Sequence, residues 1–564
     1  MRSLWKRVMF VFVTVLGVFL VARVNPIFSQ NPPQNTGERV SRSGAFSLLW
    51  GDGKSFITSS QLVFSLIDDK GSPTEVVIPE ALQKKSGGIL ALDRRHLQIK
   101  GQLKSLQVKG KTTQVLEAET IQPLTGASDS PVLGEVKGAV IGSQPWVNIL
   151  CKFQDIATEP KSLSYVQDLF SSTRPGLNHY WRESSYDQVN IDGTSTVGWY
   201  TLPNIRTYYT SLGASQMLTK IFDDCVAAAN VDVFFPNYLG VNIMVNSEMD
   251  GSAWGGSRYA TLDGVSRFWY TTWEPPWGYG NQTVLAHEMG HGFGLPHSSG
   301  DYGYTYDNRW DVMSDDWSNC TRSTNPTFGC LGQHTISFHK DRLQWIPVAE
   351  KQTVSTGTQT VTLEQLALPQ TANKKMIVLP IGGSQTLFYT VEVRRWTGYD
   401  VKLPGEAVII HNVDTTRLNP AHVVDIDGNG NTGDAGAMWT VGEIFTDVTN
   451  GITVSIDSMS SSGYIVTVAN NSGSMPTPVS TATPTPSPVP FLTPTPSLVP
   501  TPTPTPLQIP GDANGDGKVD SGDYAIWLVH YDQPTLNRSS DGDFNGDGIV
   551  DGVDYIIWLT YYGT

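Results

Sequence analysis

The sequence is poor in positive charge, in cysteine and in long apolar runs, and each shortage narrows what the chain can do. Its formal net charge of -15 argues against nucleic acid and anionic membrane surfaces as partners. Beyond residue 30, no stretch is long and apolar enough to span a membrane. The apolar content of 39% and the charged content of 16% are typical of globular proteins. A chain of 564 residues is too long for one core, so we expect several domains.

The N-terminal segment, residues 1–30, has the charge pattern of an export signal. Arg2, Lys6 and Arg7 precede an apolar run over residues 8–22, which suits a signal peptide better than a membrane span of about twenty residues. Because no small-residue cleavage site directly follows this run, an uncleaved N-terminal membrane anchor is the alternative. Both interpretations place the rest of the chain outside the cytoplasm, either secreted or held at the cell surface.

The four cysteines fit an exported protein. An even number favours two disulfides, and four cysteines permit three pairings. Sequence proximity favours Cys320 with Cys330, which leaves Cys151 with Cys225. All four lie between residues 140 and 345, which suggests that this segment is one unit.

Composition and periodicity divide the remaining chain into five segments. Short apolar runs broken by Gly and Ser predict a β-rich domain over residues 31–138, and mixed strand and helix patterns predict an α+β domain over 139–348. Residues 349–471 return to strand patterning, for which a β-sandwich is expected. The segment 472–510 is rich in Pro and Thr, with thirteen prolines and no charged residue from 476 to 510, and predicts an extended polyproline II linker. A sequence repeat with a period of 31 residues fills the last segment, 511–564, where each copy has an acidic loop followed by one helix pattern.

The strongest chemical signal lies in residues 286–297, which read AHEMGHGFGLPH. His287 and His291 stand one helical turn apart on the same face, so both can bind one metal ion. Gly294 can adopt a positive φ and turn the chain back, which brings His297 in as a third ligand. Three neutral imidazoles leave one position open for water, as catalytic zinc requires. Glu288 is placed to take a proton from that water and pass it to a leaving amine.

The spacing His287-x-x-x-His291-x-x-Gly294-x-x-His297, followed by Met313 sixteen residues later, resembles the metzincin family of zinc peptidases. The resemblance implies a zinc endopeptidase in which Met313 forms the hydrophobic floor of the metal site. Several metzincin branches have a tyrosine two residues after this methionine, where this chain has Asp315. Weak candidates for that role are Tyr302, Tyr304 and Tyr306.

Within the metzincins, the chain looks most similar to the gametolysin family and more loosely to immune-inhibitor-A-type peptidases. Carrying this resemblance are short motifs at residues 185–189, 198–203, 398–400, 403–406 and 411–414. It covers about residues 140–470 and implies a protein substrate. The propeptide cysteine that silences many metzincins is absent, because residues 31–139 contain no cysteine. The N-terminal domain is therefore either an accessory domain or a propeptide that blocks the site sterically.

The repeated acidic loops follow the twelve-residue calcium-binding pattern, in which oxygen ligands come from positions 1, 3, 5, 7 and 12. The predicted ligands are Asp512, Asn514, Asp516, Lys518 and Asp523 in the first loop and Asp543, Asn545, Asp547, Ile549 and Asp554 in the second. Two loop–helix units after a polyproline segment resemble a type I dockerin, which implies two structural Ca²⁺ ions and a cohesin domain, on a scaffoldin or cell-surface protein, as partner. The alternative is a calcium-stabilised stalk without a cohesin. Residues 425–431 are a further calcium candidate, although Gly436 at its position 12 breaks the pattern, and a solvent-exposed turn fits equally well.

Two functions of different classes remain open at this point. The first is a secreted zinc endopeptidase attached through its C-terminus to a partner. The second is a calcium-dependent adhesion or glycan-binding protein whose zinc site is vestigial. A glycoside hydrolase is suggested only by the proteins in which dockerins occur, and no carboxylate pair in the sequence supports it.

Overall fold

The computed structural model describes residues 38–54, 60–108, 111–124, 139–300, 302, 306–471, 509–515, 517–519, 521–530, 533–535, 538–545, 549–550 and 552–562. These residues form two compact units, one before Pro476 and one from Pro476 onward. The predicted export signal and almost all of the linker lie outside the described residues. None of the helices in the described ranges combines the length and hydropathy that a bilayer crossing requires.

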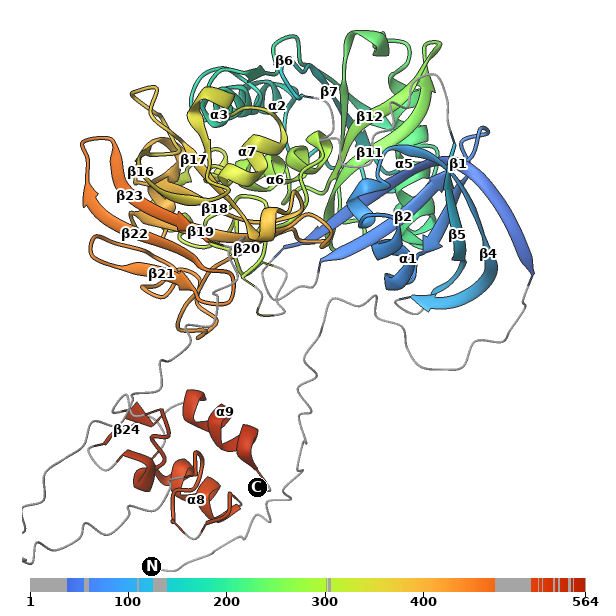
Figure 1. The fold of residues 1–564 in the computed structure, drawn as a ribbon. Coiled ribbons are helices and arrows are strands. Elements are labelled where there is room, and N and C mark those ends of the chain that lie inside the picture. Colours follow the sequence, from blue (N-terminus) through green and yellow to red (C-terminus); the bar gives the residue numbers. More distant parts are fainter. Residues whose placement is uncertain are drawn as a thin grey trace, which may run out of the picture. The chain divides into compact units, whose positions relative to one another are not determined.

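One ten-stranded sheet runs through the first unit in the order β2-β3-β5-β4-β1-β11-β12-β10-β7-β9 (Figure 1). Its strands from the N-terminal segment are β1 (Arg39–Gly53), β2 (Gln61–Ile67), β3 (Pro73–Val77), β4 (Arg95–Val108) and β5 (Lys111–Pro123). Those from the central segment are β7 (Trp146–Lys152), β9 (Ser195–Thr201), β10 (Gly240–Val245), β11 (Ser252–Leu262) and β12 (Val265–Glu274). The sheet therefore continues across the boundary that composition places near residue 138.

β1 joins the two halves of this sheet because it is long enough to pair with three partners. Residues 39–46 pair with β4, residues 45–51 pair with β2, and residues 49–53 pair with β11, always antiparallel. In the second half, β7, β9, β10 and β12 run parallel to one another, while β11 is antiparallel to both of its neighbours.

Two apolar cores cover the faces of the parallel strands. Side chains alternate across a strand, so Val147 and Ile149 of β7 enter the core with helix α5 (Ala214–Ala229), whereas Trp146 and Leu150 enter the core with helix α6 (Gln282–Phe293). Because α6 is buried on every side, the protein interior surrounds the motif that it carries.

The remaining helices of this unit are α1 (Glu80–Lys85), α2 (Leu163–Leu169), α3 (Leu177–Ser184), α4 (Arg206–Thr210) and α7 (Ser337–Arg342). Short 3₁₀ turns are η1 (Ile89–Ala91), η2 (Phe235–Asn237), η3 (Cys320–Arg322), η4 (Val348–Glu350), η5 (Ile381–Gly383) and η6 (Gly398–Lys402), and short strands are β6 (Gly142–Ser143), β8 (Val189–Asn190), β13 (Thr324–Asn325) and β14 (Gly329–Cys330).

Residues 351–470 form two sheets that share one apolar core, which is the arrangement of a β-sandwich. The first sheet contains β15 (Lys351–Thr353), β17 (Met376–Pro380), β18 (Leu387–Arg394), β19 (Ala407–Asp414) and β20 (Ala421–Val423). The second contains β16 (Gly357–Glu364), β23 (Gly463–Asn470), β22 (Ile452–Met459) and β21 (Ile444–Asp447).

A buried ionic cluster ties this sandwich to the central segment. Arg394 lies 3.1 Å from Glu392 and 2.9 Å from Asp400, and all three side chains are fully buried. Arg394 also donates a hydrogen bond to the backbone oxygen of Trp310, just before Met313. The sandwich therefore supports the loop that passes beneath α6.

The second unit contains the two copies of the repeat. Its elements are α8 (Ser521–His530), β24 (Gln533–Pro534), η7 (Arg538–Asp541), β25 (Ile549–Val550) and α9 (Gly552–Tyr561). The copies pack against each other symmetrically, because Tyr524 contacts Trp558 and Trp527 contacts Tyr555 at ring-centroid distances of 5.0 and 5.1 Å.

Candidate metal centre

Helix α6 brings its two histidines to the same buried point. It ends at Gly294, whose φ of 98° is the left-handed conformation that glycine adopts most easily. The chain then turns back, and the side chain of His297 meets those of His287 and His291. Sequence reasoning predicted this turn and this third histidine, and the structure brings all three side chains together.

The three Nε2 atoms lie 3.1–3.2 Å from one another, and each residue is at most 2% exposed. Nδ1 of His287 lies 2.6 Å from the backbone oxygen of Val312, and Nδ1 of His291 lies 2.7 Å from that of Leu295. A neutral imidazole that donates from Nδ1 presents a lone pair at Nε2. A cation placed between the Nε2 atoms of His287 and His291, which lie 3.1 Å apart, would bind such lone pairs.

The donor set fits zinc. Nitrogen ligands arranged tetrahedrally around zinc, at Zn–N distances of about 2.0–2.1 Å, lie about 3.3 Å apart, close to the spacing of these atoms. Zinc-bound histidines typically donate their other ring N–H to a backbone oxygen or a carboxylate, which fixes the tautomer and the ring orientation, and Nδ1 of His287 and of His291 lies beside such an oxygen. Imidazole also binds other transition metals.

A fourth donor comes from the N-terminal segment. The carboxylate of Asp52, near the end of β1, lies 3.4 Å from Nε2 of His287, 3.4 Å from that of His291 and 3.1 Å from that of His297. Burial opposes ionisation of Asp52, but attraction to His297 and His287 outweighs it and holds the pKa of the carboxyl well below its ordinary value. Sequence reasoning missed this residue, because nothing in the pattern of β1 links it to a helix that begins 230 residues later.

Glu288 lies beside the histidines in a pocket. Both of its carboxylate oxygens are buried, and neither has a hydrogen-bond partner among the described residues. Burial, together with the negative charges of Asp52, Glu274 and Asp316, raises the pKa of Glu288 well above its ordinary value. Other residues lining the pocket include Asp52, Trp277, Tyr306, Asp315 and Trp317.

Met313 lies against α6 at Gly290. A β-carbon at Gly290 would come within 2.4 Å of its Sδ atom, so only glycine allows this approach. The turn that carries Met313 is organised by Asp311, which accepts hydrogen bonds from the backbone of Met313 at 3.1 Å and from Ser298 at 2.7 Å. Asp311 also pairs with His339 at 2.9 Å, and both side chains are fully buried.

The three tyrosine candidates lie in different surroundings. Tyr306 donates a hydrogen bond of 2.5 Å to Asp52, and its ring centroid lies 5.7 Å from that of His297. Tyr302 instead donates to Asp425, and Tyr304 lies outside the described residues. Tyr306 is therefore the one of the two described candidates that reaches the histidines, while Asp315 accepts a hydrogen bond from the backbone of Ser318 at 2.9 Å.

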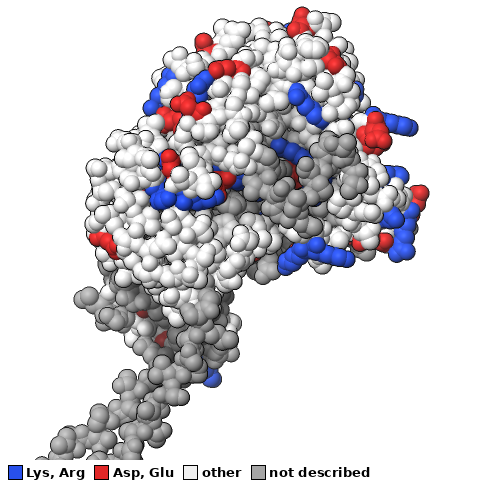
Figure 2. Space-filling model, turned by 45° about the horizontal axis from the view of Figure 1, so that its top comes forward, with Lys and Arg blue, Asp and Glu red and all other residues white. Residues whose placement is uncertain are grey.

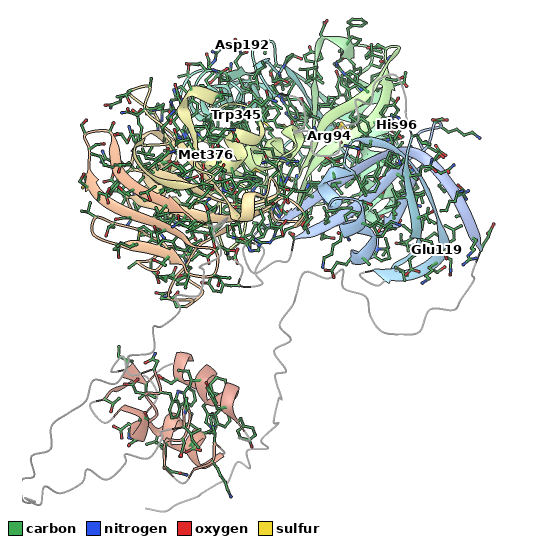
Figure 3. All side chains as sticks on the ribbon, viewed as in Figure 1. Arg94, His96, Glu119, Asp192, Trp345 and Met376 are labelled. Atoms are coloured by element: carbon green, nitrogen blue, oxygen red, sulfur yellow. A yellow bond between two sulfur atoms is a disulfide. The ribbon has the colours of Figure 1, made fainter. Side chains whose placement is uncertain are left out.

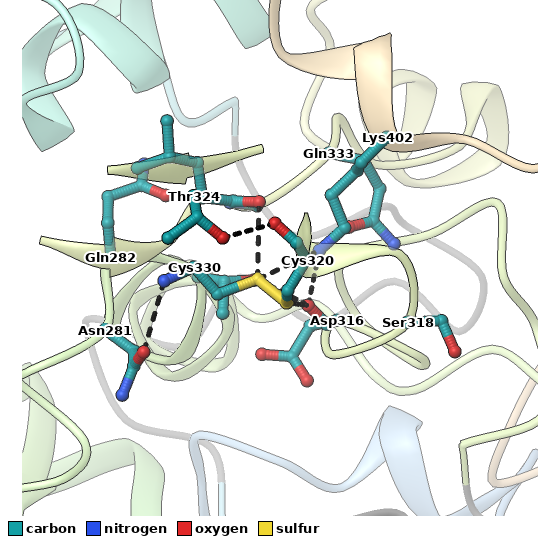
Figure 4. Close-up of a disulfide and its surroundings, with 12 residues drawn as sticks. Asn281, Gln282, Asp316, Ser318, Cys320, Thr324, Cys330, Gln333 and Lys402 are labelled. Atoms are coloured by element: carbon teal, nitrogen blue, oxygen red, sulfur yellow. Dashed lines mark hydrogen bonds between the residues drawn. A yellow bond between two sulfur atoms is a disulfide. The ribbon is translucent and has the colours of Figure 1, made fainter. Parts of the chain in front are cut away.

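Two disulfides brace the surrounding fold. Cys151 pairs with Cys225, which joins β7 to α5, and Cys320 pairs with Cys330. Figure 4 shows the second disulfide beside Lys402, which donates a hydrogen bond to the backbone oxygen of Asp316. The Cys320–Cys330 disulfide therefore stabilises the loop that follows Met313 and lines the pocket. These are the two pairs that sequence proximity favours.

Most of the other tryptophan and histidine side chains around the site pack in the core or pair with buried carboxylates. Trp254, Trp269 and Trp273 are fully buried in the core beside α5, whereas Trp277 lines the pocket. His334 and His339 are fully buried in pairs with Glu183 and Asp311.

The predicted calcium loops have the same internal arrangement. Asp523 accepts hydrogen bonds from the backbone nitrogens of residues 513 and 514, and Asp554 accepts them from residues 544 and 545. Asp512 accepts hydrogen bonds from residues 515 and 517. Asp523, Asp543 and Asp554 are fully buried, and Asn514, Lys518, Asn545 and Ile549 lie in the loops between the acidic residues. Asp516 and Asp547 lie outside the described residues.

The acidic turn near residue 425 has a different arrangement from the calcium loops. Carboxylate oxygens of Asp425, Asp427 and Asp434 lie within 4.8 Å of one another. Gly436 contributes no side chain there, and its backbone oxygen accepts a hydrogen bond from Ile426. The turn therefore lacks the position-12 carboxylate of a twelve-residue loop.

No protein-family model matches the sequence, and no curated protein matches it. Function must therefore be inferred from the geometry of the metal centre and from the motifs of the chain.

Proposed function

We propose that the chain is an extracellular zinc endopeptidase of the metzincin type, with Glu288 as its general base. The observation that carries this proposal is the convergence of three histidine Nε2 atoms within 3.2 Å, beside a buried glutamate without a hydrogen-bond partner among the described residues. Zinc held by His287, His291 and His297 would lower the pKa of a bound water to about 7 and polarise a peptide carbonyl. The motif resemblance supports the metzincin type, and the geometry of the three histidines and Glu288 supports zinc-dependent peptide hydrolysis.

The chain's own residues would divide the remaining work. Glu288 accepts the proton of the attacking water and delivers it to the leaving amine, a role open to a buried carboxylate whose oxygens have no hydrogen-bond partner among the described residues. Tyr306 has a hydroxyl beside the metal position, where it can donate a hydrogen bond to a developing oxyanion. Met313 packs below the histidines and keeps α6 in place. On the face in Figure 2, charged side chains lie scattered among uncharged ones, so no extended patch of one sign favours a nucleic acid there.

The test compares the wild type with Glu288→Gln, with Glu443→Gln in the sandwich as control. Each purified chain is assayed untreated and after limited trypsin digestion, with zinc measured by mass spectrometry and cleavage measured on a peptide library. We expect one zinc per chain throughout, and a loss of kcat/KM of about 10²–10⁴-fold only in Glu288→Gln. Full activity of Glu288→Gln refutes the proposed mechanism. Bound zinc without cleavage in any form favours an adhesion or glycan-binding protein.

We also propose that the second unit is a dockerin-like module that binds two Ca²⁺ ions and attaches the enzyme to a cohesin-bearing partner. Support comes from the duplicated acidic loops and from the symmetric packing of the two copies. Calorimetric titration should give two Ca²⁺ ions for the wild type and none for Asp512→Asn combined with Asp543→Asn. Asp69→Asn, in an exposed turn of the first unit, is the control. Calcium binding without capture by immobilised cohesins favours the calcium-stabilised stalk.

A further inference from the structure

The structure assigns Asp52 as a fourth metal ligand, and we propose that the N-terminal segment is an inhibitory prodomain that fills the substrate cleft. This inference rests on the proposed peptidase function, since a cleft is blocked only if it binds a substrate. Catalytic zinc keeps one coordination position open for water, and a carboxylate at that position closes it. Asp52 lies within 3.4 Å of all three histidine Nε2 atoms and supplies that carboxylate.

The backbone around Asp52 occupies the edge that an extended peptide would use. Residues 49–53 of β1 pair antiparallel with residues 252–256 of β11, and Asp52 lies opposite Ala253. Among the described residues, β11 pairs with β12 and, besides it, with no strand other than β1. Without β1, therefore, β11 would expose unpaired backbone N–H and C=O groups, the kind of edge that captures peptides by strand addition. In this arrangement β1 takes the place of a bound peptide substrate, and Asp52 lies where the peptide bond to be cleaved would approach the metal.

Side chains of the N-terminal segment hold this arrangement around the metal. The indole ring of Trp50 stacks on the imidazole of His291, with ring centroids 4.9 Å apart and planes 3° apart. The guanidinium of Arg94 donates hydrogen bonds to the backbone oxygens of His291 at 3.0 Å and of Gly292 at 2.6 Å, in the last turn of the zinc-binding helix. Figure 3 shows Arg94 where the N-terminal strands approach the central segment. The prodomain therefore contacts both the metal ligands and the helix that carries them.

The interface extends beyond the metal. Leu49 and Val63 belong to the same apolar core as Trp254 of β11. Ser65 Oγ lies 2.8 Å from Ser215 Oγ of α5, and Gln61 donates a hydrogen bond of 2.8 Å to Ser252 Oγ. An accessory domain that merely sits beside a catalytic domain needs no carboxylate in the metal site, so the position of Asp52 favours an inhibitory prodomain. This distinguishes the two roles that sequence analysis left open for residues 31–138.

The test compares two full chains that both carry Glu288→Gln, so that neither can process itself: one keeps Asp52 and the other carries Asp52→Asn. Asp69→Asn in the same background is the control. The full chains are loaded with Co²⁺, and their visible spectra are recorded before and after titration with acetohydroxamate, a small ligand that binds the metal directly. We expect Asp52→Asn to change the Co²⁺ spectrum. We also expect it to bind acetohydroxamate at least about tenfold more tightly, because an intramolecular carboxylate competes at an effective concentration of about millimolar.

The outcomes separate this inference from the proposed function. Unchanged spectra and unchanged acetohydroxamate affinity in Asp52→Asn refute the Asp52 ligand, even if the trypsin-treated wild type cleaves peptides. Failure of every chain to bind Co²⁺ or Zn²⁺ refutes the peptidase itself. In the active background, the untreated wild type and untreated Asp52→Asn should both show little cleavage, because β1 fills the cleft in each, and cleavage should appear only once the N-terminal segment has been removed.

Discussion

Replacing Gly290 with alanine tests the packing beneath the metal centre, because two known effects there have opposite signs. Gly290 lies within α6, and an alanine in a helix interior stabilises by roughly 0.5–1 kcal/mol relative to glycine. The new β-carbon would, however, lie 2.4 Å from Sδ and 3.1 Å from Cε of Met313. Overpacking of this kind costs about 1–3 kcal/mol. We therefore expect Gly290→Ala to destabilise the first unit by up to about 2.5 kcal/mol.

The assay is urea denaturation of a double-mutant cycle with Met313→Ala. Removing the Met313 side chain beyond its β-carbon eliminates the clash, so Gly290→Ala should become stabilising by roughly 0.5–1 kcal/mol in that background. The interaction energy between the two sites should then be about 1–3 kcal/mol. If Gly290→Ala stabilises the wild type as much as it stabilises Met313→Ala, then Met313 does not lie against α6 and does not form the floor of the metal site.

Two further substitutions test other parts of the fold. Burial opposes ionisation of Asp311, but attraction to His339 outweighs it and lowers the pKa of Asp311 below its ordinary value of 3.8. The stability that this pair contributes is therefore fully present above pH 3.8 and is lost as the pH falls through the lowered pKa. Asp311→Asn should cost about 3–5 kcal/mol at pH 7 and progressively less below pH 4, as measured by urea denaturation, and an equal cost at both pH values would contradict the pairing. In the second unit, Gly542 and Gly515 both have positive φ, but a β-carbon at Gly542 would lie 2.7 Å from the backbone of Trp527 whereas Gly515 faces open space. Gly515→Ala should therefore lower the free energy of unfolding by about 1–2 kcal/mol, and Gly542→Ala should lower it clearly more, as measured by thermal melts with Ca²⁺. Equal losses in the two variants would contradict the symmetric packing.

The residues that sequence could predict are those whose geometry is local. His287 and His291 follow from the helical period, and Gly294 follows from the need to end that helix with a left-handed residue before His297. The repeated acidic loops are local in the same way, because each predicted calcium-ligand position lies within twelve residues of the others. Met313 needed a family resemblance, since its sixteen-residue distance from His297 has no periodic explanation.

Asp52 could not be predicted because its position depends on a strand pairing between distant segments. The register that places residue 52 opposite residue 253 is set by pairing across some 200 residues, and a shift by one residue would turn the carboxylate to the other face of the sheet. Tyr306 could be named from the sequence only as one of three candidates, because the loop that carries it toward the histidines has no periodic structure. Composition also drew a boundary near residue 138, whereas the sheet crosses it, because backbone hydrogen bonds between strands require no particular side chains.

The division of β1 among three partners explains how a carboxylate could compete with a substrate for the cleft. Fixing the backbone of a free peptide costs about 1–2 kcal/mol per residue, and a substrate must meet that cost when it binds. In β1, residues 39–51 are already ordered by β4 and β2, so the five residues that pair with β11 arrive as the continuation of a formed strand. A pre-ordered strand of this kind can outcompete an extended peptide that makes the same backbone hydrogen bonds. Trypsin treatment would then activate the proposed peptidase only where the cut N-terminal segment also dissociates, because cuts in its loops alone would leave β1 held by β2 and β4.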